Sequence, residues 1–153
     1  MKRPAQSAGP SPSDERTLTN PPNRRKDRGM ILTLSQVALG GAIGACLRYL
    51  VQGASLRLLG PSFPFGTLMV NVAGSFLMGL LFVMLADKGG LRFAPFLLTG
   101  ILGGFTTFSA FSLDTALLWE RGANWLSLGY VGASVILSLA ALVAGLQLAR
   151  SMI

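Results

Sequence analysis

Four long apolar segments alternate with short polar connectors along this chain. The pattern predicts helices at about 31–51, with an extension to about Leu59, and at about 66–86, 93–119 and 125–149. Each segment is long enough to cross the hydrocarbon core of a bilayer, which takes about 20 apolar residues in a helix. Because hydrocarbon satisfies no backbone hydrogen bonds, each span must be helical. The sequence therefore predicts an all-α integral membrane protein with four transmembrane helices.

The first 29 residues have a different character. They are polar, rich in proline, serine and charge, and show no apolar periodicity. Such a composition predicts a disordered tail ahead of a single membrane domain at residues 30–153. Met30 stands directly before the first apolar segment and is an alternative translation start. Whether the tail belongs to the mature protein is therefore open.

Composition excludes most enzymatic chemistry. The chain has no histidine and a single cysteine, Cys46, which excludes histidine bases, zinc or copper sites and disulfide frameworks. A serine–lysine pair is also disfavoured, since Lys88 lies in a connector and Lys2 and Lys26 lie in the tail. The net charge of +7 is typical of membrane topology and lipid headgroups rather than nucleic-acid binding. We expect a membrane protein that is not an enzyme.

The basic residues of the membrane domain give it almost no preferred orientation. Four spans place both termini on one side of the membrane. Three basic residues then face that side and two the other: Lys88, Arg92 and Arg150 against Arg57 and Arg121. By the positive-inside rule, such a domain inserts either way round. The basic residues at 24–28 would instead favour a cytoplasmic N-terminus.

The third segment contains the most unusual stretch of the chain. Two glycines, Gly103 and Gly104, precede two threonines, Thr106 and Thr107, and this combination predicts a break in the helix near mid-membrane. Irregular backbone at that depth is stable only inside protein or along a cavity, where freed carbonyls suit cations and amides suit anions. The alternative is that Gly100 and Gly104 simply allow close helix packing.

Hydroxyl and aromatic side chains recur at helical spacing after this stretch. In the third segment, phenylalanines recur every three residues at Phe105, Phe108 and Phe111, and hydroxyl residues do so at Thr106, Ser109 and Ser112. In the fourth segment, polar residues recur every four residues at Tyr130, Ser134 and Ser138. Hydroxyl donors beside the positive edges of aromatic rings form a surface that could hold a small dehydrated anion. Ordinary packing of a helix core is the simpler alternative.

Three further polar residues stand in apolar surroundings. Asn71 carries an amide that needs partners inside the membrane. Arg48 either extends to the interface or attracts an anion to a vestibule. Asp114 is the sole acidic residue within an apolar segment, and is either a residue near a helix end or the counter-ion of Arg48.

Three motifs taken together resemble the Fluc (CrcB-type) fluoride channel family. They are GGAIGA at 40–45 with Arg48 and Tyr49, FGTL at 65–68 with Asn71 and Gly74, and GGFTTFSAFS at 103–112. The resemblance extends from about Met30 to the C-terminus. It implies an antiparallel, dual-topology homodimer of four-helix subunits, with two fluoride pores along the subunit interface and a structural sodium ion (Na⁺) at the centre.

The resemblance also implies roles for individual residues. The backbone oxygens of Gly103 and Thr106 would bind sodium, Phe108 and Phe111 would line the pores, and Asn71 would donate to the anion. Arg48 would be the vestibule arginine. The polar lining would comprise Ser109, Tyr130, Ser134 and Ser138.

Three positions depart from the family's usual pattern. Ala110 replaces a threonine of the polar track, Asp114 stands where glutamate is common, and Leu142 occupies a position where some relatives have a hydroxyl. The departures leave the details of the anion path open.

The function implied is passive export of fluoride across a bacterial inner membrane, which relieves fluoride toxicity. Fluoride, membrane lipid and a second copy of the chain are the expected partners. One alternative is a small dual-topology transporter, but a drug–proton exporter needs a carboxylate in its first helix and this helix has none. The other is a non-transporting membrane scaffold, in which glycines and hydroxyls serve only packing and no ion flux occurs.

Overall fold

A computed structural model describes residues 24–87 and 89–153. The chain forms two units, residues 1–31 and a core of residues 32–153. Residues 1–23 and Lys88 lie outside the described residues, so disorder of the tail stays a prediction there. The last six residues of the predicted tail are helical, because helix α2 begins at Arg24. Arginine and lysine are good helix formers, and Asp27 in the first turn suits the positive end of the helix dipole.

Within the described residues, four helical stretches are long and apolar enough to cross a membrane. The first lies within α2 (Arg24–Leu59), the second is α3 (Phe65–Asp87) and the fourth is α6 (Asn124–Ser151). The third stretch, Gly90–Glu120, is divided into shorter elements. These are η1 (Gly90–Phe93), η2 (Pro95–Leu102), α4 (Gly103–Phe105) and α5 (Phe108–Glu120). The predicted four-span, all-helical membrane fold is confirmed.

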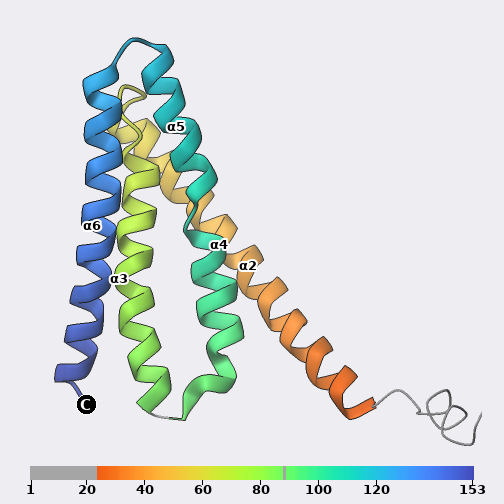
Figure 1. Cartoon of the computed structure of the whole chain (residues 1–153). Coiled ribbons are helices and arrows are strands. Elements are labelled where there is room, and N and C mark those ends of the chain that lie inside the picture. The colour runs from red at the N-terminus through yellow and green to blue at the C-terminus, as the bar shows by residue number, and fades with distance from the viewer. Residues whose placement is uncertain (1–23, 88) are drawn as a thin grey trace, which may run out of the picture. The chain divides into compact units, whose positions relative to one another are not determined.

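Helices α3 and α6 lie side by side along their length (Figure 1). Their backbones approach most closely where Gly79 and Gly145 face the opposite helix. A Cβ atom added to Gly145 would overlap the carbonyl of Phe76, and one added to Gly79 would overlap the carbonyl of Leu142. Without side chains at these two positions, the helices come close enough for extensive van der Waals contact, which stabilises helix pairs in lipid.

Within the core, α2 packs against the third span in the same manner. A Cβ atom on Gly40 or Gly44 would overlap the carbonyl of Phe96 or Ile101, and one on Gly104 would crowd the backbone of Gly41. The close-packing interpretation of the glycines in the third segment is therefore confirmed. It holds together with the predicted break, described below.

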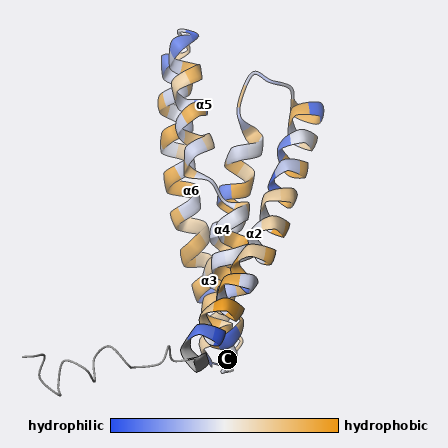
Figure 2. Ribbon diagram, turned by 90° about the vertical axis from the view of Figure 1, so that its right-hand side faces the viewer, coloured by the Kyte–Doolittle hydropathy of each residue, from blue (hydrophilic) through white to orange (hydrophobic). Residues whose placement is uncertain are grey.

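Most of the large apolar side chains of residues 32–153 are exposed on the surface of this unit. Val70 and Tyr130 are fully buried, whereas Leu58 and Trp125 are 83% and 86% exposed. Figure 2 shows apolar residues over the outer faces of the helices as well as between them. In water such a surface would drive association, whereas lipid tails solvate it. The distribution agrees with a protein whose surroundings are apolar.

Candidate functional site

The third span is interrupted by two extended residues, Thr106 (ψ 156°) and Thr107 (φ −154°, ψ 121°). The predicted break is confirmed, but the threonines form it. Gly103 has ordinary right-handed helical angles (φ −64°, ψ −35°). β-Branched threonine loses side-chain freedom in a helix and favours extended backbone, so two in succession allow the chain to leave the helix at this point.

A π-helix, η2, leads into the break. Its wider turn is visible at its end, where the Gly103 N–H points to the carbonyls of Gly100 and Leu98. Short π-helical stretches are uncommon and occur often at functional sites. Pro95 at the start of this helix lacks an N–H, but no pattern in the sequence distinguishes a π-helix from an α-helix, and this element was not predicted.

The polar groups around the break are paired with one another. The Asn71 side chain accepts a hydrogen bond from the Thr107 N–H (Oδ1, 2.8 Å) and donates one to the Thr107 carbonyl (Nδ2, 3.0 Å). The Thr107 hydroxyl accepts from the Ala110 N–H (3.2 Å) and so caps α5. Thr106 donates from both its N–H (3.0 Å) and its hydroxyl (2.9 Å) to the Leu102 carbonyl. The break is therefore a specific, bonded conformation.

A groove with a volume of about 630 Å³ opens beside the break between α3, α5 and α6. Seven of the ten residues to which the resemblance assigns a role line it: Asn71, Gly103, Thr106, Phe108, Phe111, Ser134 and Ser138. These residues come from three different spans. Their common location is the main structural support for the predicted site.

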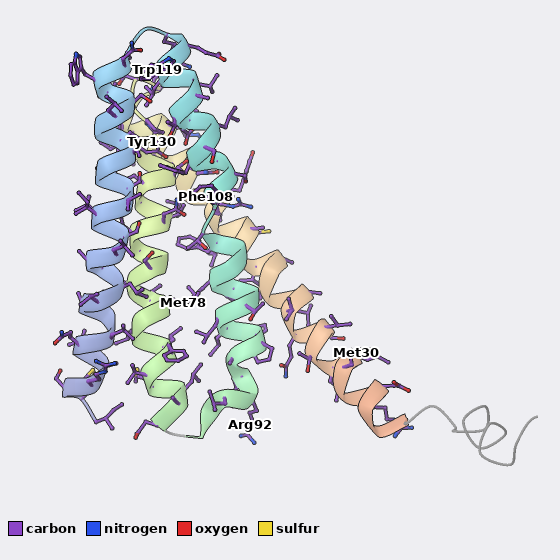
Figure 3. The ribbon with its side chains drawn as sticks, viewed as in Figure 1. Met30, Met78, Arg92, Phe108, Trp119 and Tyr130 are labelled. Carbon is purple, nitrogen blue, oxygen red and sulfur yellow. The ribbon has the colours of Figure 1, made fainter. Side chains whose placement is uncertain are left out.

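Aromatic rings form one wall of the groove. Phe108, at the first position of α5, is 79% exposed (Figure 3) and its ring centroid lies 5.4 Å from that of Phe111. The Phe111 ring lies 5.4 Å from Tyr130, which in turn contacts Phe63 edge-on at 5.5 Å. The row runs from the exposed surface beside the break to the buried Tyr130.

Two serines of α6 contribute polar groups to the same groove. The Ser134 and Ser138 hydroxyl oxygens are buried, and neither forms a hydrogen bond of ordinary geometry among the described residues, although the Ser134 hydroxyl lies close enough to the Tyr130 phenol to interact with it. On α5, by contrast, Ser112 and Thr115 donate to carbonyls of their own helix, those of Phe108 (3.0 Å) and Phe111 (2.8 Å). Because an unpaired buried hydroxyl costs free energy, Ser134 and Ser138 are the groups in the groove most available to a ligand.

Other predicted residues lie outside this groove. Ser109 is exposed, and its hydroxyl forms a hydrogen bond with the Thr107 hydroxyl at 3.2 Å, in which either group can be the donor. Tyr130 is buried and donates to Asp114 (3.4 Å). Arg48 is half-buried and forms no ion pair within the described part of the chain, so the alternative of an Arg48–Asp114 pair is not observed.

A second cavity of about 330 Å³ lies beside the 60–65 turn and the end of α5. Ala110 and Asp114, two of the departures noted above, line it, whereas Leu142 lines the groove. The cavity also contains a pair that sequence reasoning missed, Gln52 and Thr67, joined at 3.4 Å. The available signal was the position of Thr67, one helical turn before Asn71 on the same face of α3.

No group of three acidic, cysteine or histidine side chains that could hold a metal ion occurs among residues 24–87 and 89–153. A cation bound in this part of the protein would have to be held by backbone or hydroxyl oxygens. The break is the place where such oxygens leave the helical pattern. The Thr107 N–H is donated to Asn71, and so it does not reach the carbonyl of Gly103, its partner in an unbroken helix.

Residues 35–146 match the model of the family described as "CrcB-like protein, Camphor Resistance (CrcB)". The chain is 64% identical over 121 residues to a "Fluoride-specific ion channel FluC" of Cereibacter sphaeroides, a match that covers 79% of this chain and 97% of the relative. A protein of the same name from Paracoccus denitrificans is 60% identical over 120 residues, 78% of this chain and 96% of the relative. One from Agrobacterium fabrum is 52% identical over 124 residues, 80% and 99% respectively.

The relatives are named as ion channels, which confirms the prediction that the chain is not an enzyme. The matched region includes all three motifs on which the resemblance rested, and the break and groove lie within it. The chain belongs to the CrcB-like family.

Proposed function

We propose that this chain forms a fluoride-selective channel that exports fluoride passively across the bacterial inner membrane. The names of the relatives support the choice of anion. The observation in the structure that carries the proposal is the pair of buried hydroxyls of Ser134 and Ser138, which form no hydrogen bond of ordinary geometry and line the same groove as the rings of Phe108 and Phe111.

The chemistry of the groove suits a small, strongly hydrated anion. Fluoride leaves water only when several donors replace its hydration shell at once. Serine hydroxyls and the positive edges of phenylalanine rings supply donors without a fixed positive charge, so an ion is coordinated but not trapped. Arg48, half-buried on α2, would attract anions toward an outer vestibule. Tyr130 and Ser109 would continue the polar lining.

The groove also suggests the assembly. It is open on one side, and Phe108 at its rim is 79% exposed although it lies at the middle of the third span. A second copy packed against this face would cover the ring and enclose two equivalent paths, one per subunit. Because the charges of the core are nearly balanced, the copy can take the opposite orientation, giving an antiparallel homodimer.

The backbone at the break fits a sodium ion held between two such subunits. Sodium prefers oxygen ligands, and carbonyls freed from helical bonding are common cation ligands inside membranes. Here the Thr106 carbonyl belongs to a residue with extended backbone angles. The Gly103 carbonyl loses its helical donor because the Thr107 N–H donates to Asn71. Two carbonyls from each subunit would hold the ion, which supplies positive charge that joins the subunits.

Fluoride efflux from proteoliposomes tests the proposal, with chloride efflux as the comparison. The purified protein should release fluoride rapidly and chloride hardly at all, and Phe108→Ile should reduce fluoride efflux at least about tenfold. Phe82→Ile is the matched control, since Phe82 is exposed on α3 and lies outside the groove. Efflux unchanged by Phe108→Ile would refute the aromatic lining. No efflux from folded dimers would favour the scaffold.

A further inference from the structure

We propose that Asn71 is a positioning residue that holds the break open and thereby exposes the Gly103 carbonyl to the sodium ion. This inference rests on the sodium site of the proposed function. It assigns the Asn71 amide to the protein backbone, whereas the resemblance to the family assigns it to the anion.

The two hydrogen bonds of Asn71 are made to one residue from a different span. Asn71 lies on α3 and Thr107 on the third span, 36 positions later in the chain, and the bonds to its N–H and carbonyl are 2.8 and 3.0 Å long. An amide carries its acceptor oxygen and its donor nitrogen on separate atoms, so it can accept from the backbone N–H and donate to the backbone carbonyl of one residue together. It therefore replaces the bond that the Thr107 N–H would make in a continuous helix, and it adds a bond to the carbonyl of Thr107, which also begins α5 as its N-cap.

The pairing leaves the Gly103 carbonyl without its helical donor. In an unbroken α-helix the Thr107 N–H would donate to the carbonyl four residues earlier, that of Gly103. Bonding to Asn71 Oδ1 removes this donor. Neighbouring contacts hold the arrangement in place, because Gly74, on the same side of α3, leaves only enough space for the Thr106 methyl group. Asn71 therefore holds Thr107 by hydrogen bonds, and Gly74 provides the space for the side chain of Thr106.

The mechanism predicts different results for two substitutions of Asn71. Leucine has similar size but no polar group, so Thr107 N–H is free to return to the Gly103 carbonyl. Aspartate keeps the acceptor for the Thr107 N–H. Its ionised form lacks the donor to the Thr107 carbonyl and adds a negative charge, which does not weaken the binding of a cation nearby, and its protonated form keeps a donor. The Gly103 carbonyl should therefore stay available in Asn71→Asp and become occupied in Asn71→Leu. Asn124→Leu is the control, since Asn124 is exposed at the start of α6.

The experiment measures the unfolding midpoint of the full chain in detergent as sodium chloride replaces N-methylglucamine chloride. For the wild type, sodium should raise the midpoint. Asn71→Leu should need at least about tenfold more sodium for half of the rise, a size typical of lost outer-sphere support at metal sites. Asn71→Asp and Asn124→Leu should respond as the wild type does. Fluoride efflux of Asn71→Leu should recover when sodium is raised.

Three results would overturn the inference while the channel stands. The first is an Asn71→Leu midpoint that falls equally at every sodium concentration, as expected of a merely structural role. The second is loss of the sodium response in Asn71→Asp as well as in Asn71→Leu. The third is fluoride efflux lost at all sodium concentrations with an unchanged sodium response, which would assign the amide to the anion. A wild type that ignores sodium would overturn the sodium site itself, independently of fluoride efflux.

Discussion

Replacing Gly145 by alanine tests whether backbone contact between α3 and α6 stabilises the core. The added methyl group would overlap the carbonyl of Phe76 and lie 3.0 Å from the Leu80 nitrogen. Neither atom can move without moving α3, so we expect the upper end of the overpacking range, about 3 kcal/mol. Alanine is the better helix former by about 1 kcal/mol. The net loss in the free energy of unfolding should be about 2 kcal/mol.

Gly129→Ala is the matched control on the same helix, because no atom lies within 4 Å of a Cβ atom built there. It should leave stability unchanged or raise it by up to about 1 kcal/mol. Reversible unfolding in mixed detergent, followed by circular dichroism, measures both variants. Adding Gly79→Ala should cost less than it does alone, since the helices are already separated. Equal stability of Gly145→Ala and Gly129→Ala would refute the reasoning.

Two further predictions concern a helix contact and the orientation of the chain. Ser127 is 1% exposed and donates to the Thr115 carbonyl at 2.9 Å, so Ser127→Ala should cost about 1 kcal/mol in the unfolding assay, whereas Ser151→Ala, at an exposed serine bonded within its own helix, should cost nothing measurable. Glutamine at the four basic positions of 24–28 should move the two orientations, of which the one with a cytoplasmic N-terminus is favoured by these charges, closer to equal populations. A C-terminal reporter active on one side of the membrane measures this; unchanged orientation would show that these charges do not set it.

The four spans were predictable because the bilayer constrains the sequence directly. A stretch that crosses hydrocarbon must be apolar, long and helical, whatever it packs against. The same reasoning predicted the break, since adjacent glycines and β-branched residues weaken a helix locally. It could not predict that Gly103 stays helical and the threonines leave the helix, because that choice depends on Asn71 accepting the Thr107 N–H.

The candidate site was predicted as a set of residue types and assembled only by the fold. Ser134 and Ser138 looked like ordinary packing serines, since serine in a helix usually bonds to its own backbone. The lack of a well-formed hydrogen bond to their hydroxyls, and their place in one groove with Phe108 and Phe111, are visible only in the tertiary structure.

By itself the sequence therefore determined the membrane location, the number of spans and the chemical groups available, because each follows from local composition. The tertiary structure decided which of these groups are free. Hydrogen-bond partners come from residues far apart in the chain, as Asn71 and Thr107 do. Whether a polar group in a membrane protein can meet an ion depends on whether the protein has already satisfied it.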